Sequence, residues 1–320
     1  MTATTNPFEL EGEWLRCALH THSSESDGDL PPRALAAHYE AAGFDLLAIS
    51  DHWRLTRVPS TKRLLTIPSA ELSFDLGEGA GDVLVYGISE IPEDPGGDRR
   101  NWLVNEEEHW EQRTFPNLTA AGRFAQEQGG VAYLAHPYWT GLDPSVAVAA
   151  DHVAGLEVFN GTGETETGRG DSSFTWDAVL ESGKTAFGIA TDDAHVPLFD
   201  IGIAWTWLRV PERSEEAAIH GLRTGALYAS SGPEFRELRR EGAVVVVACS
   251  PCRRIVLAME RERGCSVSAG RGGRQFGRIL ETNDDGLITR AAIESPWPDP
   301  RYVRVVAEDA EGRRAWTSPI

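Results

Sequence analysis

Histidine and carboxylate side chains recur where short apolar segments of this sequence end. One such segment ends in His20 and His22, and a later one is followed by Asp193 and His195. In a β-strand, residues two apart point to the same side, so each pair directs its two side chains together. Imidazoles and carboxylates are typical ligands of zinc, iron and manganese. For His20 and His22 taken alone, a pair of ordinary histidines at a strand end is the alternative interpretation.

Further candidate ligands lie within or beside other apolar segments. Glu71 lies in LLTIPSAELSF, where a carboxylate is costly to bury unpaired, although a strand end that faces water would also accommodate it. Asp82 begins DVLVYGI, and His136 ends VAYLAH. The full candidate set is His20, His22, Asp27, His52, Glu71, Asp82, His136, Asp193 and His195. So many mixed nitrogen and oxygen ligands exceed the needs of one ion, and we expect two or three divalent cations: zinc, manganese or iron.

Such a centre predicts hydrolysis. Two cations about 3.5–4 Å apart polarise a substrate oxygen and lower the pKa of a bridging water towards 7. The resulting hydroxide can attack phosphorus or a carbonyl carbon. The residues assigned to catalysis are His20, His22, Glu71, Asp193 and His195.

Three residues are candidates for substrate contact. Arg54 and Arg169 could meet an anionic group, although a solvated loop arginine is the alternative for Arg169. Trp139 could line an apolar pocket, together with aromatic side chains of residues 90–117, a segment that we interpret either as an insertion over the site or as a solvated surface excursion. The Gly-rich segment GTGETETGRGDS lacks the spacing of a phosphate-binding P-loop.

The elements that must position these side chains alternate between strand and helix from residue 15 to about 230. In the first unit, Pro31 and Pro32 begin an Ala-rich helix and Gly43 ends it. This alternation predicts a parallel sheet or barrel, whose site lies at the carboxyl ends of the strands. From about residue 234 strand-like segments follow one another without long helices, which predicts a small antiparallel β domain of the sandwich type. We therefore expect domains at 14–232 and 233–320.

Composition limits the class of protein. The chain has 320 residues, 41% hydrophobic and 25% charged, with a formal net charge of -19. A charge of that sign disfavours nucleic acid as a partner, and a small-molecule substrate is expected. No apolar run reaches membrane-spanning length and no signal peptide is recognised, so no membrane association and a cytoplasmic location are expected. The four cysteines show no disulfide framework. The oligomeric state is left open.

The motifs HTHSSESDGDL, AISDH, SAEL, LAHP and DDAH, in this order, resemble those of the polymerase-and-histidinol-phosphatase (PHP) family of metal-dependent phosphoesterases. The resemblance implies a distorted (β/α)7 TIM-like barrel with up to three metals. It places His20, His22, Glu71 and Asp193 on one ion, with Glu71 bridging to a second that His136 also holds. Asp27, His52 and His195 would hold a third, and Asp51 would orient a ligand. Asp82 stands near the place where many relatives have a histidine, which puts the second ion in doubt.

Other segments resemble one branch of that family. EVFN and the closing YVRVVAEDAEGRRAWTSPI are similar to carbaryl-hydrolase-like members, in which a β domain follows the barrel. The first expectation is therefore a phosphoesterase that acts on a small phosphomonoester or phosphodiester. The alternative is a hydrolase of carbamate, ester or amide bonds with the same metal centre. A nuclease-like or inactive PHP module is the third possibility.

Overall fold

Strand β1 (Glu13–Ala18) lies between β11 and β2 in the largest sheet and leads directly into the first pair of histidines. The structure is a computed structural model that describes residues 6–97, 99–103, 109–270 and 276–320. In it β1 pairs in parallel with β2 (Leu46–Leu47) and antiparallel with β11 (Trp205–Val210). These strands belong to a nine-stranded sheet in the order β16-β15-β19-β20-β12-β11-β1-β2-β3. Its remaining strands are β3 (Leu65–Thr66), β12 (Leu227–Ser230), β15 (Arg254–Ala258), β16 (Gly264–Ser268), β19 (Arg304–Glu308) and β20 (Arg314–Thr317).

A five-stranded sheet supplies the other strand ends that carry candidate ligands. Its order is β10-β9-β8-β5-β4, from β4 (Ser69–Asp75), β5 (Ala80–Tyr86), β8 (Val131–Leu134), β9 (Gly155–Asn160) and β10 (Phe187–Thr191). Strands β8, β9 and β10 are parallel, whereas β5 is antiparallel to both β4 and β8. The helical elements are η1 (Pro7–Glu9), α1 (Pro32–Ala41), α2 (Leu118–Glu127), α3 (Pro137–Thr140), α4 (Pro144–Ala149), α5 (Gly161–Thr167), α6 (Ser173–Glu181), α7 (Pro197–Asp200) and α8 (Glu215–Thr224).

The resemblance implied a distorted (β/α)7 TIM-like barrel, and the described strands show no closed barrel. They form an α/β architecture of separate sheets, because β5 inserts antiparallel between β4 and β8, and β11 follows β1 antiparallel. The nine- and five-stranded sheets approach each other at two isolated parallel bridges, Thr21 with Ala194 and His52 with Glu71. Both bridges involve or adjoin candidate ligands, so the two sheets converge at the predicted site.

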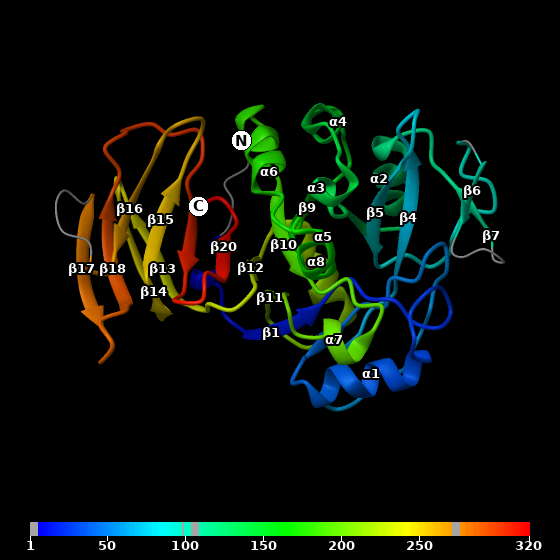
Figure 1. The fold of residues 1–320 in the computed structure, drawn as a ribbon, viewed down its shortest axis with the longest axis horizontal. Helices are drawn as coiled ribbons and strands as arrows, with labels where there is room; N and C mark the ends of the chain where they lie inside the picture. The colour runs from blue at the N-terminus through cyan, green and yellow to red at the C-terminus, as the bar shows by residue number, and fades with distance from the viewer. Residues whose placement is uncertain (1–5, 98, 104–108, 271–275) are drawn as a thin grey trace.

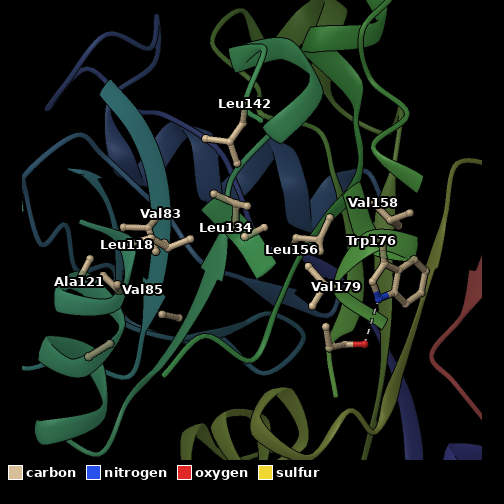
Figure 2. Close-up of a cluster of buried hydrophobic side chains, with 14 of the residues drawn as sticks. Val83, Val85, Leu118, Ala121, Leu134, Leu142, Leu156, Val158, Trp176 and Val179 are labelled. Atoms are coloured by element: carbon tan, nitrogen blue, oxygen red, sulfur yellow. Dashed lines mark hydrogen bonds between the residues drawn. The ribbon is translucent and has the colours of Figure 1, made fainter. Parts of the chain in front are cut away.

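Helices α2 and α6 pack against the five-stranded sheet through a buried apolar cluster. Leu118 and Ala121 of α2 lie near Val83 and Val85 of β5, as Figure 2 shows. Asn117 begins α2 by accepting a hydrogen bond from the backbone of Ala120, as an N-cap residue does. In α6, Trp176 is fully buried, and its indole nitrogen donates to the carbonyl of Ala186 at 3.0 Å. This packing positions the strand ends of β8, β9 and β10.

The C-terminal strands lie together on one side of the molecule, coloured yellow to red in Figure 1. A four-stranded antiparallel sheet is built from β13 (Phe235–Glu241), β14 (Val244–Cys252), β18 (Ile288–Glu294) and β17 (Gly277–Thr282). It shares a buried core with strands of the nine-stranded sheet, as an antiparallel β region should. However, β12 pairs with β20, so one sheet runs through the predicted boundary at residue 232. The division into two domains remains a prediction.

Residues 90–117 contain a two-stranded sheet, β6 (Arg99–Leu103) with β7 (His109–Arg113). Trp102 and Trp110, the tryptophans of this segment, are outside the part of the chain whose side chains are described, so neither interpretation of the segment is tested. The four cysteines are all free and buried. No helix in the described ranges is both long and apolar enough to span a lipid bilayer.

Candidate metal centre

Histidine and carboxylate side chains from six strands or strand ends meet in one buried cluster. Each of the nine predicted ligands belongs to at least one group whose potential ligand atoms lie within 4.8 Å of one another. The four groups are His22, Asp27, His52 and His195; His20, His22 and Glu71; His20, His136 and Asp193; and Glu71, Asp82 and His136. The structure therefore brings the whole predicted ligand set together, although their roles as ligands remain a proposal.

The centre of the cluster is formed by His20 and His22 with two carboxylates. Their Nε2 atoms are 3.1 Å apart, and they lie 3.1 and 3.2 Å from the Oε2 atom of Glu71. The Oδ1 atom of Asp193 is 3.1 and 3.3 Å from the same two nitrogens. Ligands of a tetrahedral zinc ion at 2.0–2.1 Å would be about 3.3 Å from one another. The spacing of these atoms therefore suits a divalent cation between them.

A neighbouring carboxylate sets the orientation of the His20 ring. The Nδ1 atom of His20 lies 2.8 Å from Oε1 of Glu157, so it carries the hydrogen and donates it to the carboxylate. In the neutral imidazole the Nε2 atom then presents a lone pair. This lone pair faces the lone pairs of the two carboxylates, Glu71 and Asp193, an arrangement that requires a proton or a metal ion between them.

The second part of the cluster is formed by His136, Glu71 and Asp82. The Nδ1 atom of His136 lies 3.1 Å from the hydroxyl of Thr140, which itself donates to the carbonyl of His136. Thr140 therefore accepts from Nδ1, and the Nε2 atom is directed at Oε1 of Glu71 at 3.0 Å. Glu71 thus turns Oε2 to His20 and His22 in the first part of the cluster and Oε1 to His136 in the second. Asp82, oriented by a 2.7 Å hydrogen bond from Ser73, joins this group despite its departure from the family pattern.

The third part of the cluster surrounds Asp27. Its Oδ2 atom lies 3.5 Å from Nε2 of His52 and 3.4 Å from Nε2 of His195. The ring of His22 stacks between the other two imidazoles, with centroids 4.7 Å from His52 and 4.3 Å from His195. The Nδ1 atom of His195 lies 3.0 Å from the backbone carbonyl of Asp193, so its Nε2 atom presents a lone pair. This part is more exposed than the first two.

Asp51 orders the loop between His22 and Asp27. It accepts hydrogen bonds from the backbone nitrogen and hydroxyl of Ser23, each at 2.7 Å, and from the hydroxyl of Ser26 at 2.8 Å. The expected orienting role is therefore indirect, because these bonds reach the loop that carries Asp27 and no imidazole directly.

Two observations test whether the residues suit a metal. The Oδ1 atom of Asp193 is buried and accepts no hydrogen bond in the described part of the chain, although Nε2 of His20 and of His22 lie 3.1 and 3.3 Å away. An unpaired buried carboxylate oxygen is costly, and a cation would satisfy it. In addition, Asp193 and His136 adopt positive φ angles of 56° and 24°. Such backbone strain persists where the surroundings impose it and is concentrated at functional sites. The donor set therefore fits divalent cations.

Attraction between the imidazoles and the carboxylates raises the pKa values of the histidines and lowers those of the acids. Burial alone would lower the pKa of His136 and His195, but the hydrogen bonds and charges of Glu71, Asp193 and Asp27 outweigh it and raise both pKa values to about 9. Burial alone would raise the pKa of Glu71 and Asp193, but the surrounding imidazoles hold both well below the usual range. Protons on the histidines therefore serve as the countercharge when no cation is bound.

Sequence reasoning assigned no role to Glu157, which is fully buried behind the cluster. It accepts from His20, from the backbone nitrogen of His136 at 2.7 Å, from Asn160 at 3.0 Å and from the hydroxyl of Thr191. The signal was present, because Glu157 lies in the apolar strand GLEVFN just as Glu71 lies in its own strand. A carboxylate at that depth requires partners, as it did for Glu71.

The three residues predicted to contact substrate have different surroundings. Trp139 follows His136 and packs edge-to-face on its ring, with centroids 5.0 Å apart. Arg54 forms an ion pair with Glu25 at 2.6 Å, and Arg169 is exposed after α5. Contact with a substrate remains a prediction for all three.

Comparison with known proteins extends the resemblance at the level of fold. No protein-family model matches the chain, and no curated protein matches its sequence. A crystal structure of a two-domain protein from Bacteroides vulgatus, containing a predicted PHP-like metal-dependent phosphoesterase, matches with a TM-score of 0.52 at 15% identity. The match covers 97% of this chain and 96% of that one, so the shared fold includes the C-terminal strands.

Two further solved structures match less closely. A candidate metal-dependent phosphoesterase from Bifidobacterium adolescentis has a TM-score of 0.40 at 16% identity, over 58% of this chain and 89% of that chain. A lesion-specific endonuclease from Pyrococcus furiosus has a TM-score of 0.46 at 13% identity, over 66% of this chain and 56% of that chain.

Proposed function

We propose that the chain is a metal-dependent hydrolase of the PHP type that acts on phosphoesters. The observation that carries the proposal is that imidazole nitrogens and carboxylate oxygens point towards one another at the centre of the cluster. The Nε2 atoms of His20 and His22 lie 3.1 Å apart, and each lies 3.1–3.3 Å from a carboxylate oxygen of Glu71 and from one of Asp193. The PHP-like fold of the Bacteroides vulgatus protein agrees with this proposal.

The residues divide into three sets of ligands in the proposal. The first set is His20, His22, Glu71 and Asp193; the second is Glu71, Asp82 and His136; and the third is Asp27, His52 and His195. When bound, divalent zinc, manganese or iron would supply Lewis acidity and a hydroxide at neutral pH. We propose two or three such ions, with Glu71 shared between the first two because its oxygens face opposite parts of the cluster.

The chain's own residues have defined parts in this chemistry. Glu157 and Thr140 hold His20 and His136 in the tautomer that presents Nε2. Burial of His20, His22 and Glu71 excludes bulk water, which strengthens the electrostatic interactions there. His195 is half-exposed and adjoins Asp27, and we propose it as the group nearest to entering substrate. We also propose a cytoplasmic location and a small-molecule substrate.

Metal removal and reloading test the proposal. Chelator-treated protein is reloaded separately with manganese, iron and zinc, and assayed with p-nitrophenyl phosphate, bis-p-nitrophenyl phosphate and a naphthyl carbamate. We expect hydrolysis of at least one phosphoester, dependent on metal. Hydrolysis of the carbamate alone would replace the proposal by the carbamate, ester or amide alternative. Folded, metal-loaded protein that hydrolyses none of them would refute it.

A further inference from the structure

Large hydrophobic side chains that remain exposed are concentrated beside the candidate metal centre. In the described part of the chain they are Tyr138, Trp139, Phe174, Val196, Leu198, Phe199 and Leu280. Tyr138 and Trp139 come within three residues after His136, and Val196, Leu198 and Phe199 come within four residues after His195. Phe174 lies two residues after Ser172, which bonds to Tyr138. We call these six the apolar rim. Exposed apolar side chains that gather in one region mark a binding surface more often than those scattered singly.

One side of the apolar rim is attached to His136. Tyr138 and Trp139 follow it directly in α3, and the Trp139 ring packs on the imidazole. The backbone nitrogen of Tyr138 donates to the hydroxyl of Ser172 at 3.1 Å. This bond places the start of α6, with Phe174 78% exposed, beside α3.

The other side of the apolar rim is attached to His195. Val196 follows it, and Leu198 and Phe199 lie in α7, 82% and 79% exposed. The carboxylate of Asp200 accepts from the backbone nitrogens of both His195, at 3.0 Å, and Val196, at 2.7 Å. Helix α7 is therefore held close to the imidazole, and in Figure 1 it lies near the end of β1.

The row of imidazole rings joins the two sides. His136 is 5.6 Å from His20, His20 is 5.1 Å from His22, and His22 is 4.3 Å from His195, measured between ring centroids. The two sides of the apolar rim are therefore attached to the first and the last ring of this row, His136 and His195. A molecule whose reactive group lies on the metals would bring its substituents to these side chains.

We propose that the apolar rim binds an aryl or branched alkyl group that the substrate carries next to its reactive group. This inference rests on the proposed function, because the reactive group is placed by the metals. Its support is continuity, since Trp139 packs on one candidate ligand and α7 is tied to another. The substrate class is thus an ester of the metal-bound group with a bulky apolar alcohol or phenol.

Paired substrates with one leaving group test the proposal. Phenyl p-nitrophenyl phosphate and methyl p-nitrophenyl phosphate differ only in the ester group that remains. The ratio of their kcat/KM values is compared between the metal-loaded wild type and the double variant Leu198→Ser/Phe199→Ser, so that intrinsic reactivity cancels. We expect the phenyl preference to fall about tenfold, the factor for returning roughly 60 Å² of apolar surface to water. Leu280→Ser, on β17, is the matched control and should leave the ratio unchanged.

The outcomes separate this proposal from the proposed function. Turnover with the same ratio in wild type and double variant would overturn the apolar rim and leave phosphoester hydrolysis standing. If neither substrate is hydrolysed, the proposed function fails. The apolar rim is then tested by calorimetry, which compares the dissociation constants of phenylphosphonate and methylphosphonate. A preference for phenylphosphonate that is lost in the double variant supports the proposal, and an unchanged preference overturns it. A wild-type dimer that the double variant dissociates would also overturn it, because a second copy would cover these side chains.

Discussion

Replacing Glu157 by glutamine should loosen the metal centre although this residue is no candidate ligand. In the structure both of its oxygens accept hydrogen bonds, one from His20 and Thr191 and the other from the backbone of His136 and from Asn160. Glutamine fits the same space but offers one acceptor and one donor. Whichever way its amide turns, its NH2 group faces two of these donors.

The magnitude follows from the bonds that are lost. If the amide nitrogen faces His136 and Asn160, two buried donors lose their acceptor, at about 1–3 kcal/mol each. If it faces His20, the ring is driven towards the tautomer with a hydrogen on Nε2, the atom that faces Glu71 and Asp193. Loss of such outer partners weakens metal binding by about 10–100-fold. We expect the Glu157→Gln protein to fold, with a free energy of unfolding reduced by about 2–6 kcal/mol.

Competition with a fluorescent chelator measures the metal affinity, and chemical denaturation of the metal-free protein measures stability. Glu308→Gln is the matched control, because Glu308 is also buried and accepts from Arg253, Arg254 and Arg314, but it lies in β19. It should destabilise the protein without changing metal affinity. An unchanged affinity in Glu157→Gln, or an equal loss in both variants, would show that Glu157 does not act through His20.

Three further predictions concern the metal centre and the fold. The double variant His20→Ala/His22→Ala should lose bound metal and hydrolysis but keep its circular dichroism spectrum, whereas His38→Ala, on the exposed side of α1, should keep all three; metal analysis and activity assays decide. The pKa values of His136 and His195 are raised to about 9, so the stability that they give the metal-free protein is complete below pH about 6.5 and is lost as pH rises through about 9. Thermal melts across that interval should show a falling midpoint, and a flat profile would contradict the charge arrangement. Asp177→Asn should cost about 2–4 kcal/mol in denaturation, because it removes the charged partner of a buried arginine in β19; a loss below 0.5 kcal/mol would show that this contact contributes little.

The candidate site could be predicted because its signals are local. The two-residue spacing of His20 and His22 predicted that both rings point to the same side, and in the structure both Nε2 atoms face Glu71 and Asp193. Asp193 and His195 lie beyond the end of β10, and Asp193 has a φ of 56°, so the same argument does not account for their place in the cluster. Glu157 carried a similar signal, since it is the first residue of EVFN, but that motif came with no role for it. Its partners come from three other segments of the chain, and no spacing along the sequence shows that these converge.

The sheet topology was less predictable because strand direction depends on distant partners. The turn between β4 and β5 spans only residues 76–79, too short for a parallel crossover, so the antiparallel hairpin was readable in principle. By contrast, the antiparallel pairing of β1 with β11 joins segments almost 190 residues apart. The pairing of β12 with β20 likewise joins regions that the change in pattern near residue 234 had separated.

The convergence of the sheets and the clustering of ligands have one physical origin. Where the nine- and five-stranded sheets meet, strand pairing of the described backbone is limited to two isolated bridges, Thr21 with Ala194 and His52 with Glu71, and a few single backbone hydrogen bonds join the same segments. His20 and His22 extend from the first sheet, and Glu71 and Asp193 from the second. Cations held between these side chains would join the sheets where regular strand pairing stops. The gap in strand pairing and the candidate metal centre therefore coincide, because the ligands come from the segments where the two sheets stop pairing regularly.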